Sequence, residues 1–342
     1  CGYTAFTVDL TGALRLGQKN VVAVRCDCRE DLNVPPFGGQ LDALTYGGIY
    51  RAVSLDIKEP AYLRDVFIET KAEGGFRIYT ATVGETVGCT LQAEIRSPSG
   101  SRAFYTGELS LPITGALNSV HPWSIEHPTL YTLTVRLIRP GTGGLPDRVL
   151  DEKSCRFGFR TLQFVAGGLY LNGQRVELRG LNRHQSYAYQ GYAMPDSIQR
   201  LDAQLLKKEL GCNAVRTSHY PNAPEFYELC DEYGFYVIDE SDIEIHGVVN
   251  LYNLNIWKEG KKNPFPPFLS DNEDWTESVV DRVQKNVMRD KNRTSVLIWS
   301  MGNECAYGCT FEEALRWTKK FDSTRLTHYE SSRYVSDKRK YD

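Results

Sequence analysis

The second half of the sequence alternates short apolar segments with amphipathic helical segments, and this order constrains the fold more than any other feature. The helical candidates are residues 196–210, 225–233, 275–290 and 311–321, of which the first two are followed by Gly211 and Gly234 as stop signals. An apolar segment of strand length precedes each helix, and a fifth closes the series. These strand candidates are VELRGL, NAVRTS, FYVIDE, SVLIWSM and LTHYE. Strands that alternate with helices indicate a parallel sheet, as in a (β/α)8 TIM barrel.

Two of the helical segments carry apolar side chains at the spacing of one helix face, and we expect these faces to be buried. For residues 196–210 the face consists of Ile198, Leu201, Leu205, Leu206 and Leu210, and for residues 275–290 of Val279, Val280, Val283, Val287 and Met288. A complete (β/α)8 barrel takes about 250 residues, and the sequence from Gln174 to Asp342 is much shorter. We therefore expect the barrel to be cut off after its fifth strand.

The first half of the sequence has the period of β-strands rather than helices. Residues 1–59 contain FTVDL, NVVAVRC and YRAVSLDI around a Pro- and Gly-rich loop, which predicts the end of an antiparallel sandwich. Residues 60–158 contain RIYTATV, CTLQAEI and YTLTVRLI with turns at SPSG and GTGG, which fits one immunoglobulin-like sandwich. Residues 159–342 would then form the barrel part. Because the sequence opens on Cys1 in mid-pattern, we expect a piece excised from a longer chain.

Composition and charge exclude several classes of protein. The chain is 41% hydrophobic and 24% charged, as in ordinary globular proteins, and its net charge of -3 gives no reason to expect nucleic acid or an anionic membrane as a partner. No apolar run approaches the length of a membrane span. The nine cysteines lack the regular spacing of a disulfide scaffold or a metal knuckle. We therefore expect a reducing, cytoplasmic location.

Polar side chains follow the predicted barrel strands, where catalytic groups of TIM barrels lie. The clearest case is SVLIWSMGNE, a buried strand that ends in Asn303 and Glu304, because an isolated buried carboxylate is costly and so belongs at a mouth. The other strand ends carry Asn182, Arg183 and His184, then Ser218, His219 and Tyr220, then Asp239, Glu240, Glu244 and His246. Three of the six histidines are thus expected to converge on one site.

The segments RGLNRHQ, NAVRTSHYPN, YELCDEYGFYVIDESDIEIHG and SVLIWSMGNE, in this order and spacing, resemble the catalytic barrel of glycoside hydrolase family 2 and, within it, the β-galactosidases. YGGIYRAV, HPWSIEHPTLYTL and FGFR resemble the family's sugar-binding and immunoglobulin-like domains. The resemblance implies a partial jelly-roll β-sandwich, an immunoglobulin-like β-sandwich and an incomplete TIM barrel. It also implies a retaining β-galactosidase that hydrolyses terminal non-reducing β-D-galactosides, in a parent protein that is a homo-oligomer.

The resemblance carries residue roles with it. Glu304 matches the acid/base, which protonates the leaving oxygen and then activates water, and Asn303 matches the amide that holds the sugar 2-hydroxyl. His184 and His219 match residues that contact the galactosyl hydroxyls. The nucleophile of this family comes from a later strand, so no residue up to Asp342 is assigned to it. We accordingly expect this chain by itself to be inactive.

Metal sites are also implied by the resemblance. Glu244, His246 and Glu304 match the protein ligands of a Mg²⁺ near the acid/base, and a two-residue spacing in an extended segment puts Glu244 and His246 on one side. Asp42 matches a carboxylate that binds sugar and, in some family members, a Na⁺. One departure is Gln185, because many β-galactosidases have an acid directly after the first-strand histidine.

Each of these residues has a structural alternative. A carboxylate such as Glu304 can cap a helix or face solvent, loop histidines can simply be hydrogen-bonded, and Asp42 can be a turn former. Trp299 is expected to pack in the core rather than form a sugar platform, and Arg216 with Glu240 to form a structural ion pair. The Glu244 and His246 pair can be solvated.

The function also has alternatives. Within the family, β-glucuronidases share Asn-Glu and His-Tyr-Pro, although DIEIHG is similar to the galactosidases, and a β-mannosidase is a weaker option. A different class is a folded but inert carbohydrate-binding piece. A metal-dependent amide hydrolase is disfavoured because no HExxH-like helix or three-ligand zinc spacing is present.

Overall fold

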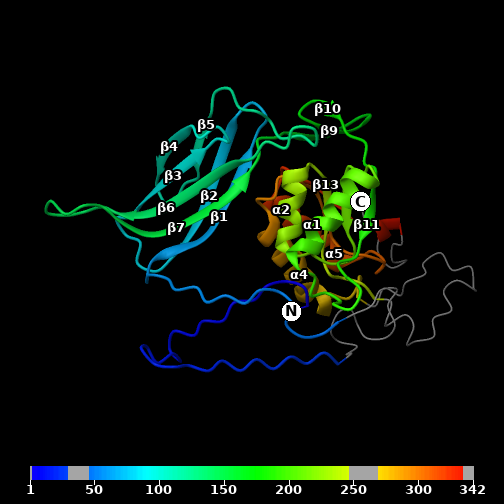
Figure 1. Cartoon of the computed structure of the whole chain (residues 1–342), viewed down its shortest axis with the longest axis horizontal. Coiled ribbons are helices and arrows are strands. Elements are labelled where there is room, and N and C mark those ends of the chain that lie inside the picture. Colours follow the sequence, from blue (N-terminus) through cyan, green and yellow to red (C-terminus); the bar gives the residue numbers. More distant parts are fainter. Residues whose placement is uncertain (1, 30–45, 246–268, 334–342) are drawn as a thin grey trace, which may run out of the picture.

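The structure is a computed structural model that describes residues 2–29, 46–245 and 269–333. Two bodies lie side by side, an all-β body from the first half of the chain and an α/β body from the second half (Figure 1). Asp42 and His246 lie outside the described residues.

The all-β body consists of two antiparallel sheets. One has the order β1-β2-β5 and the other β4-β3-β6-β7. The strands are β1 (Tyr62–Thr70), β2 (Gly75–Val83), β3 (Thr90–Arg96), β4 (Arg102–Gly107), β5 (Ile113–Ala116), β6 (Tyr131–Arg139) and β7 (Arg148–Phe157). Alternate side chains of β6, from Tyr131 to Leu137, are buried in the core between the sheets. The predicted sandwich is therefore formed, while its exact limits as a domain stay a prediction.

The α/β body is built on a parallel sheet of five strands in the order β11-β12-β13-β14-β15. These strands are β11 (Gly180–Arg183), β12 (Ala214–Thr217), β13 (Tyr236–Glu240), β14 (Val296–Ser300) and β15 (Leu326–His328). All four neighbouring pairs are parallel, as the alternation of strands and helices predicts. A small antiparallel sheet precedes it, formed by β8 (Leu162–Val165), β9 (Gly168–Leu171) and β10 (Gln174–Arg175).

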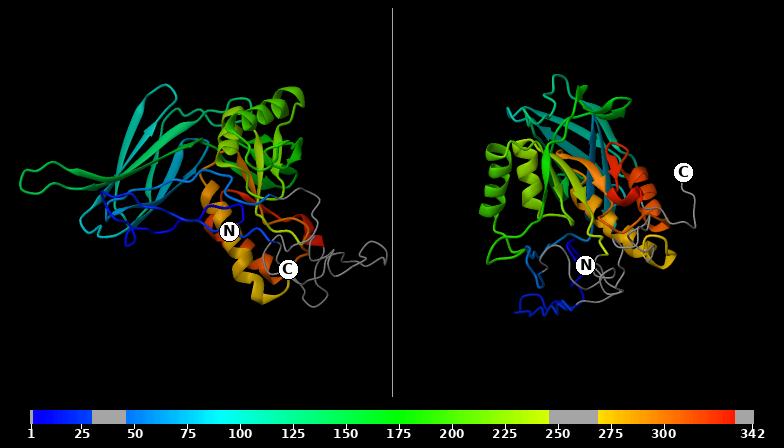
Figure 2. Two further views of the ribbon diagram at one scale, coloured as in Figure 1. Left: turned by 60° about the horizontal axis from the view of Figure 1, so that its bottom comes forward. Right: turned by 90° about the vertical axis from the view of Figure 1, so that its right-hand side faces the viewer.

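In the described ranges four helices connect these strands on the outside of the sheet (Figures 1 and 2). They are α1 (Asp196–Gln204), which continues as a π-helical turn Leu205–Glu209, α2 (Pro224–Tyr233), α4 (Thr276–Asp290) and α5 (Cys309–Phe321); 3-10 turns occupy Glu273–Trp275 and Glu330–Arg333. On α4 the predicted residues Val279, Val283 and Val287 are buried, which confirms that face. None of the helices in the described ranges has the length and apolar character needed to cross a membrane.

The predicted apolar face of residues 196–210 is formed only in part, since Leu206 is buried in the core but three other leucines are exposed. Leu201 and Leu205 are both 43% exposed and Leu210 is 60% exposed, whereas Gln199 and Ala203 are buried. The physical reason is the guanidinium of Arg183 at the end of β11, which is buried and turns a polar face of α1 inward. Its Nη2 donates to Oε1 of Gln199 at 2.7 Å and to Oδ2 of Asp202 at 2.8 Å. A buried guanidinium needs these acceptors, so it outweighs the apolar pattern of the helix.

The segments FTVDL, NVVAVRC and YRAVSLDI do not form strands, contrary to prediction. Residues 2–29 and 46–60 run as an extended trace outside the sheets (Figures 1 and 2), with Val21 85% and Val53 80% exposed. A strand is stabilised by hydrogen bonds to a neighbouring strand, and these segments have no such neighbour within the described residues. The jelly-roll sandwich stays a prediction.

The sandwich and the α/β body are joined by buried contacts. The indole N–H of Trp123, which is fully buried, donates to the carbonyl of Asp231 at the end of α2 at 2.9 Å. The side chain of Asn292 bonds both Val66 and Ile68 of β1. These bonds fix the sandwich against the back of the parallel sheet and leave the carboxyl ends of the strands free for a site.

Gly234 ends α2 in the left-handed conformation, with φ of 73°. A Cβ at this position would collide with the carbonyl of Ile125, whereas one on Gly211, with φ of 64°, would meet nothing within 4 Å. We expect Gly211→Ala to lower the free energy of unfolding by about 1–2 kcal/mol from backbone strain alone. Gly234→Ala should cost at least ~1 kcal/mol more because of the collision. Urea unfolding measures both, and equal losses would contradict this account.

Candidate active site

The carboxyl ends of β12, β13 and β14 meet at the carboxylate of Glu240, which is fully buried. Nε of Arg216 and Oγ of Ser300 both donate to Oε2 of Glu240 at 2.7 Å. Nδ1 of His219 lies 2.6 Å from the other oxygen, Oε1. Because an ionised carboxylate only accepts hydrogen bonds, Nδ1 of His219 carries the proton of this bond. Glu240 therefore fixes the position of the His219 ring.

Glu240 is charged despite its burial. Burial would raise the pKa of this carboxyl, but the hydrogen bond from His219 and the charge of Arg216 outweigh it and lower the pKa on balance. The ion pair between Arg216 and Glu240 was expected from the sequence and is present at 2.7 Å. It does more than join two strands, because Arg216 also reaches the next polar residue of the site.

Asn303, directly after β14, is held from both sides. Its Oδ1 accepts from Nη2 of Arg216 at 3.0 Å, and its Nδ2 donates to Oε1 of Glu244 at 2.9 Å. Its backbone N–H also donates to the carbonyl of Ile243 at 2.9 Å. The amide orientation is thus determined by a cation on one side and a carboxylate on the other.

Glu304 follows Asn303 and is partly buried. Its backbone N–H donates to Oε1 of Glu330, just after β15, at 2.8 Å. The next residue, Cys305, is fully buried, and its pKa is raised well above the usual value by burial and then by the negative charges of Glu244, Glu330 and Glu304. Three carboxylates therefore gather around this turn of the chain, as the strand order places them.

His184, after β11, contacts His219 edge to face, with ring centroids 5.2 Å apart. Partial burial, and then the charge of His219, lower the pKa of His184. The neutral form of the His184 ring is therefore favoured. The ring of Tyr220 lies 6.2 Å from His184 and extends the same wall.

Sequence reasoning missed several residues of this region. Tyr3 stacks on Tyr220 at 4.2 Å and its hydroxyl lies 3.0 Å from that of Tyr192, so the start of the chain contributes to the wall. No local pattern signals such a contact. His328 could have been found, because it ends β15 and its Nδ1 lies 3.0 Å from Oγ of Ser300. Since that hydroxyl donates its proton to Glu240, Nδ1 of His328 is the donor in this bond.

Other predicted residues have plain structural roles. Trp299 is fully buried, and its Nε1 donates to Asp322 at 2.9 Å, which confirms core packing. Gln185 is 2% exposed and its Oε1 accepts from the backbone N–H of Ala223 at 2.5 Å. Gln185, the residue that departs from the family pattern, therefore holds the loop before α2 in place through this hydrogen bond.

The expected metal ligands are brought together only in part. Glu244 and Glu304 converge on the same turn, as their common effect on Cys305 indicates, and His246 lies outside the described residues. Within the described residues no group of three His, Cys, Asp or Glu side chains is arranged to hold a metal ion. Two carboxylates are suitable donors for a hard cation such as Mg²⁺.

Comparison with known proteins gives a consistent set of matches. Residues 163–341 match the family model described as "Glycosyl hydrolases family 2, TIM barrel domain", and residues 61–160 match "Glycosyl hydrolases family 2". A β-galactosidase of Actinobacillus pleuropneumoniae is 36% identical over 86% of this chain and 30% of its own length. The β-galactosidase BgaC of Bifidobacterium adolescentis is 31% identical over 98% of this chain and 33% of its own length. The chain thus spans about a third of these relatives.

Solved structures show the same architecture. A β-glucuronidase of Bacteroides uniformis is 26% identical and superposes with a TM-score of 0.69 over 89% of this chain and 37% of its own. A glycosyl hydrolase family 2 member from Bacteroides cellulosilyticus superposes with a TM-score of 0.73 at 24% identity, over 96% of this chain and 44% of its own. The second likeness is one of fold.

The buried charge of Glu240 generates a prediction about stability. Because the folded-state pKa is lowered, the carboxylate stabilises the fold above its unfolded-state pKa, and this contribution is lost as pH falls through the folded-state pKa. Near pH 7 we expect Glu240→Gln to cost about 3–5 kcal/mol, since it leaves Arg216 and His219 without their partner. The difference in the free energy of unfolding between this variant and the wild type should become smaller as the pH falls below about 4. Urea unfolding at a series of pH values measures it.

The matched control is Glu228→Gln. Glu228 pairs with Arg293 at 3.1 Å, but its side chain is 53% exposed. We expect this change to cost less than about 1 kcal/mol at every pH. A loss for Glu240→Gln no larger than the control's would show that the Glu240 network does not hold the strand ends together.

Proposed function

Because the chain belongs to glycosyl hydrolases family 2, we propose that it carries the acid/base side of the catalytic centre of a retaining β-galactosidase. The observation that supports this most is the pair Asn303 and Glu304 at the end of β14, with the Asn303 amide held between Arg216 and Glu244. An amide so restrained can bind a sugar hydroxyl without first reorganising. The names of the sequence relatives favour a galactoside over a glucuronide.

In this proposal Glu304 protonates the leaving oxygen of the glycosidic bond and then removes a proton from the attacking water. Asn303 holds the 2-hydroxyl of the sugar. His219, whose ring is held by Glu240 through Nδ1, and His184 bind further sugar hydroxyls. Retention requires a second carboxylate about 5–5.5 Å away as nucleophile, and the family motifs assign that role to no residue of this sequence.

We also propose that Glu244, His246 and Glu304 hold a Mg²⁺, and that Asp42 binds sugar and a Na⁺. The convergence of Glu244 and Glu304 around Cys305 supports the first of these. The cation would neutralise two neighbouring carboxylates and keep them in one arrangement. Glu244 would then have two tasks, because it also orients Asn303.

The acid/base role predicts a dependence on the leaving group. In a protein that carries this sequence together with a complete family barrel, Glu304→Gln should lower kcat/KM for an alkyl β-galactoside by about 10²–10⁴. With a 2,4-dinitrophenyl leaving group, which needs no proton, the loss should be less than about tenfold. Steady-state assays measure both. Glu277→Gln, an exposed residue at the start of α4, is the control and should change neither value.

The same assays distinguish the alternatives. Equal losses on the two leaving groups would exclude the acid/base role of Glu304. Faster hydrolysis of an aryl β-glucuronide or β-mannoside than of the β-galactoside would contradict the proposed substrate. The proposed reaction class, glycoside hydrolysis, would still hold. Binding of galactose with no turnover of any aryl glycoside would support the inert carbohydrate-binding alternative.

The metal proposal is tested by binding alone. We expect Glu244→Gln to weaken Mg²⁺ affinity at least about tenfold in isothermal titration calorimetry, because a neutral amide is a poorer ligand for a hard cation. Glu277→Gln is again the control. Unchanged Mg²⁺ affinity in Glu244→Gln would show that Glu244 is not a ligand.

A further inference from the structure

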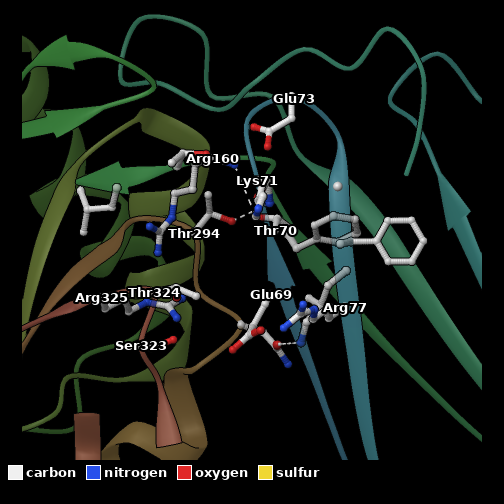
Figure 3. Close-up of a pocket in the computed structure, with 18 of the residues that line it drawn as sticks. Glu69, Thr70, Lys71, Glu73, Arg77, Arg160, Thr294, Ser323, Thr324 and Arg325 are labelled. Carbon is white, nitrogen blue, oxygen red and sulfur yellow. Dashed lines mark hydrogen bonds between the residues drawn. The ribbon is translucent and has the colours of Figure 1, made fainter. Parts of the chain in front are cut away.

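A cleft of about 570 Å³ lies between the sandwich and the α/β body. Its walls come from β1, β2 and β5, from the segment after β7, and from the loops before β14 and β15. In Figure 3 one wall carries Arg160, Thr294 and Arg325 and the facing wall carries Glu69, Lys71 and Arg77. None of the residues that line it belongs to the candidate active site.

Arg160 is the feature that sets this cleft apart. The residue is 6% exposed, and its Nη2 donates to the carbonyl of Val296 at 2.8 Å. Within the described part of the chain no carboxylate lies in ion-pair contact with Arg160, although the charges of Asp322 and Asp231 act on it from farther away. Burial, and then the charge of Arg325, lower the pKa of Arg160 to about 9. A buried cation is costly unless an anion pairs with it.

Arg325 nearby shows what a neutralised guanidinium looks like. Its Nη1 donates to Oδ2 of Asp322 at 2.7 Å, its Nε donates to the carbonyl of Val296, and its Nη2 donates to two further carbonyls. Asp322 has its pKa lowered to about 2, since the charge of Arg325 and several hydrogen bonds outweigh burial. The carboxylate is thus in direct contact with Arg325 and acts on Arg160 only through its charge.

The remaining charges of the cleft favour an anion as well. With Arg325 set aside because Asp322 neutralises it, the charged lining residues are Lys71, Arg77 and Arg160 against Glu69 and Glu73. Lys71 and Arg77 are exposed, so they can turn toward a ligand at little cost. Glu69 accepts a hydrogen bond at 3.1 Å from the hydroxyl of Tyr79, which is not one of the residues that line the cleft.

We propose that this cleft binds a small ligand that bears a carboxylate or phosphate group, with Arg160 in the wall as the specific anchor and Lys71 and Arg77 as supporting charges. A guanidinium presents paired donors that match either group in a bidentate arrangement. The volume of the cleft lies in the range of small-molecule sites, about 300–1,000 Å³. Because both bodies contribute walls, a bound ligand would also tie the sandwich to the α/β body.

The test is isothermal titration calorimetry of the whole chain with inorganic phosphate and, separately, with malonate as a carboxylate source. We expect at least one probe to bind with a Kd below about 10 mM. Lys71→Glu combined with Arg77→Glu should weaken that binding at least about tenfold, because two favourable charges are reversed. Lys208→Glu, an exposed residue of the π-helical turn after α1, is the matched control and should leave it unchanged.

Arg160→Met removes the anchor at similar volume and should abolish binding. Because Arg160 is buried, the urea midpoint of this variant is measured to check that it still folds. If it does not fold, the double variant Lys71→Glu with Arg77→Glu decides whether the cleft binds the anion. Binding of phosphate alone or malonate alone identifies the group that the site prefers. Failure of both probes to bind, or an equal loss in Lys208→Glu, would overturn the proposal.

Discussion

The buried carboxylate of Glu240 is the interaction on which the site depends. It accepts hydrogen bonds from β12 through Arg216, from the following loop through His219 and from β14 through Ser300. Two of these donors go on to orient others, since Arg216 holds Asn303 and His219 packs on His184. One charge thereby determines the geometry of four loops, which is how side chains from separate strands reach a common arrangement.

The sandwich contributes by holding the sheet from behind rather than by entering the site. Trp123 reaches the end of α2, Asn292 bonds Val66 and Ile68 on one edge of β1, and Arg160 bonds the carbonyl that begins β14. Val296 is shared between Arg160 and Arg325, so the start of the strand that ends in Glu304 is restrained by both bodies. Restraint at one end of a strand helps to position the side chains at its other end.

The sequence was sufficient where burial alone decides the outcome. Four of the five parallel strands and the apolar face of α4 could be predicted, because apolar runs and helical spacing report burial directly. The other strand, β11, begins later than the predicted VELRGL, and three of its four residues are exposed. The face of α1 could not be predicted in full, since a distant guanidinium, Arg183, selects the polar residues Gln199 and Asp202. The position of Tyr3 could not be predicted either, because Tyr3 and its contact Tyr220 lie far apart in the sequence. In the site, strand ends identified which residues gather, but not which of them hydrogen-bond.

Asp239 and Glu240 show how one strand separates two acids. Successive side chains point to opposite faces of a sheet, so Glu240 meets Arg216 while Asp239 faces the helices and accepts from the hydroxyl of Tyr227 at 2.6 Å. Burial, and then the charge of Asp290, raise the pKa of Asp239 well above its usual value. Neighbouring acids of equal burial thus have pKa values shifted in opposite directions, because the hydrogen bond from His219 and the charge of Arg216 outweigh burial at Glu240, whereas the charge of Arg289 does not outweigh it at Asp239. The position of the charge, and with it the orientation of His219 and Asn303, follows from the alternation of the strand.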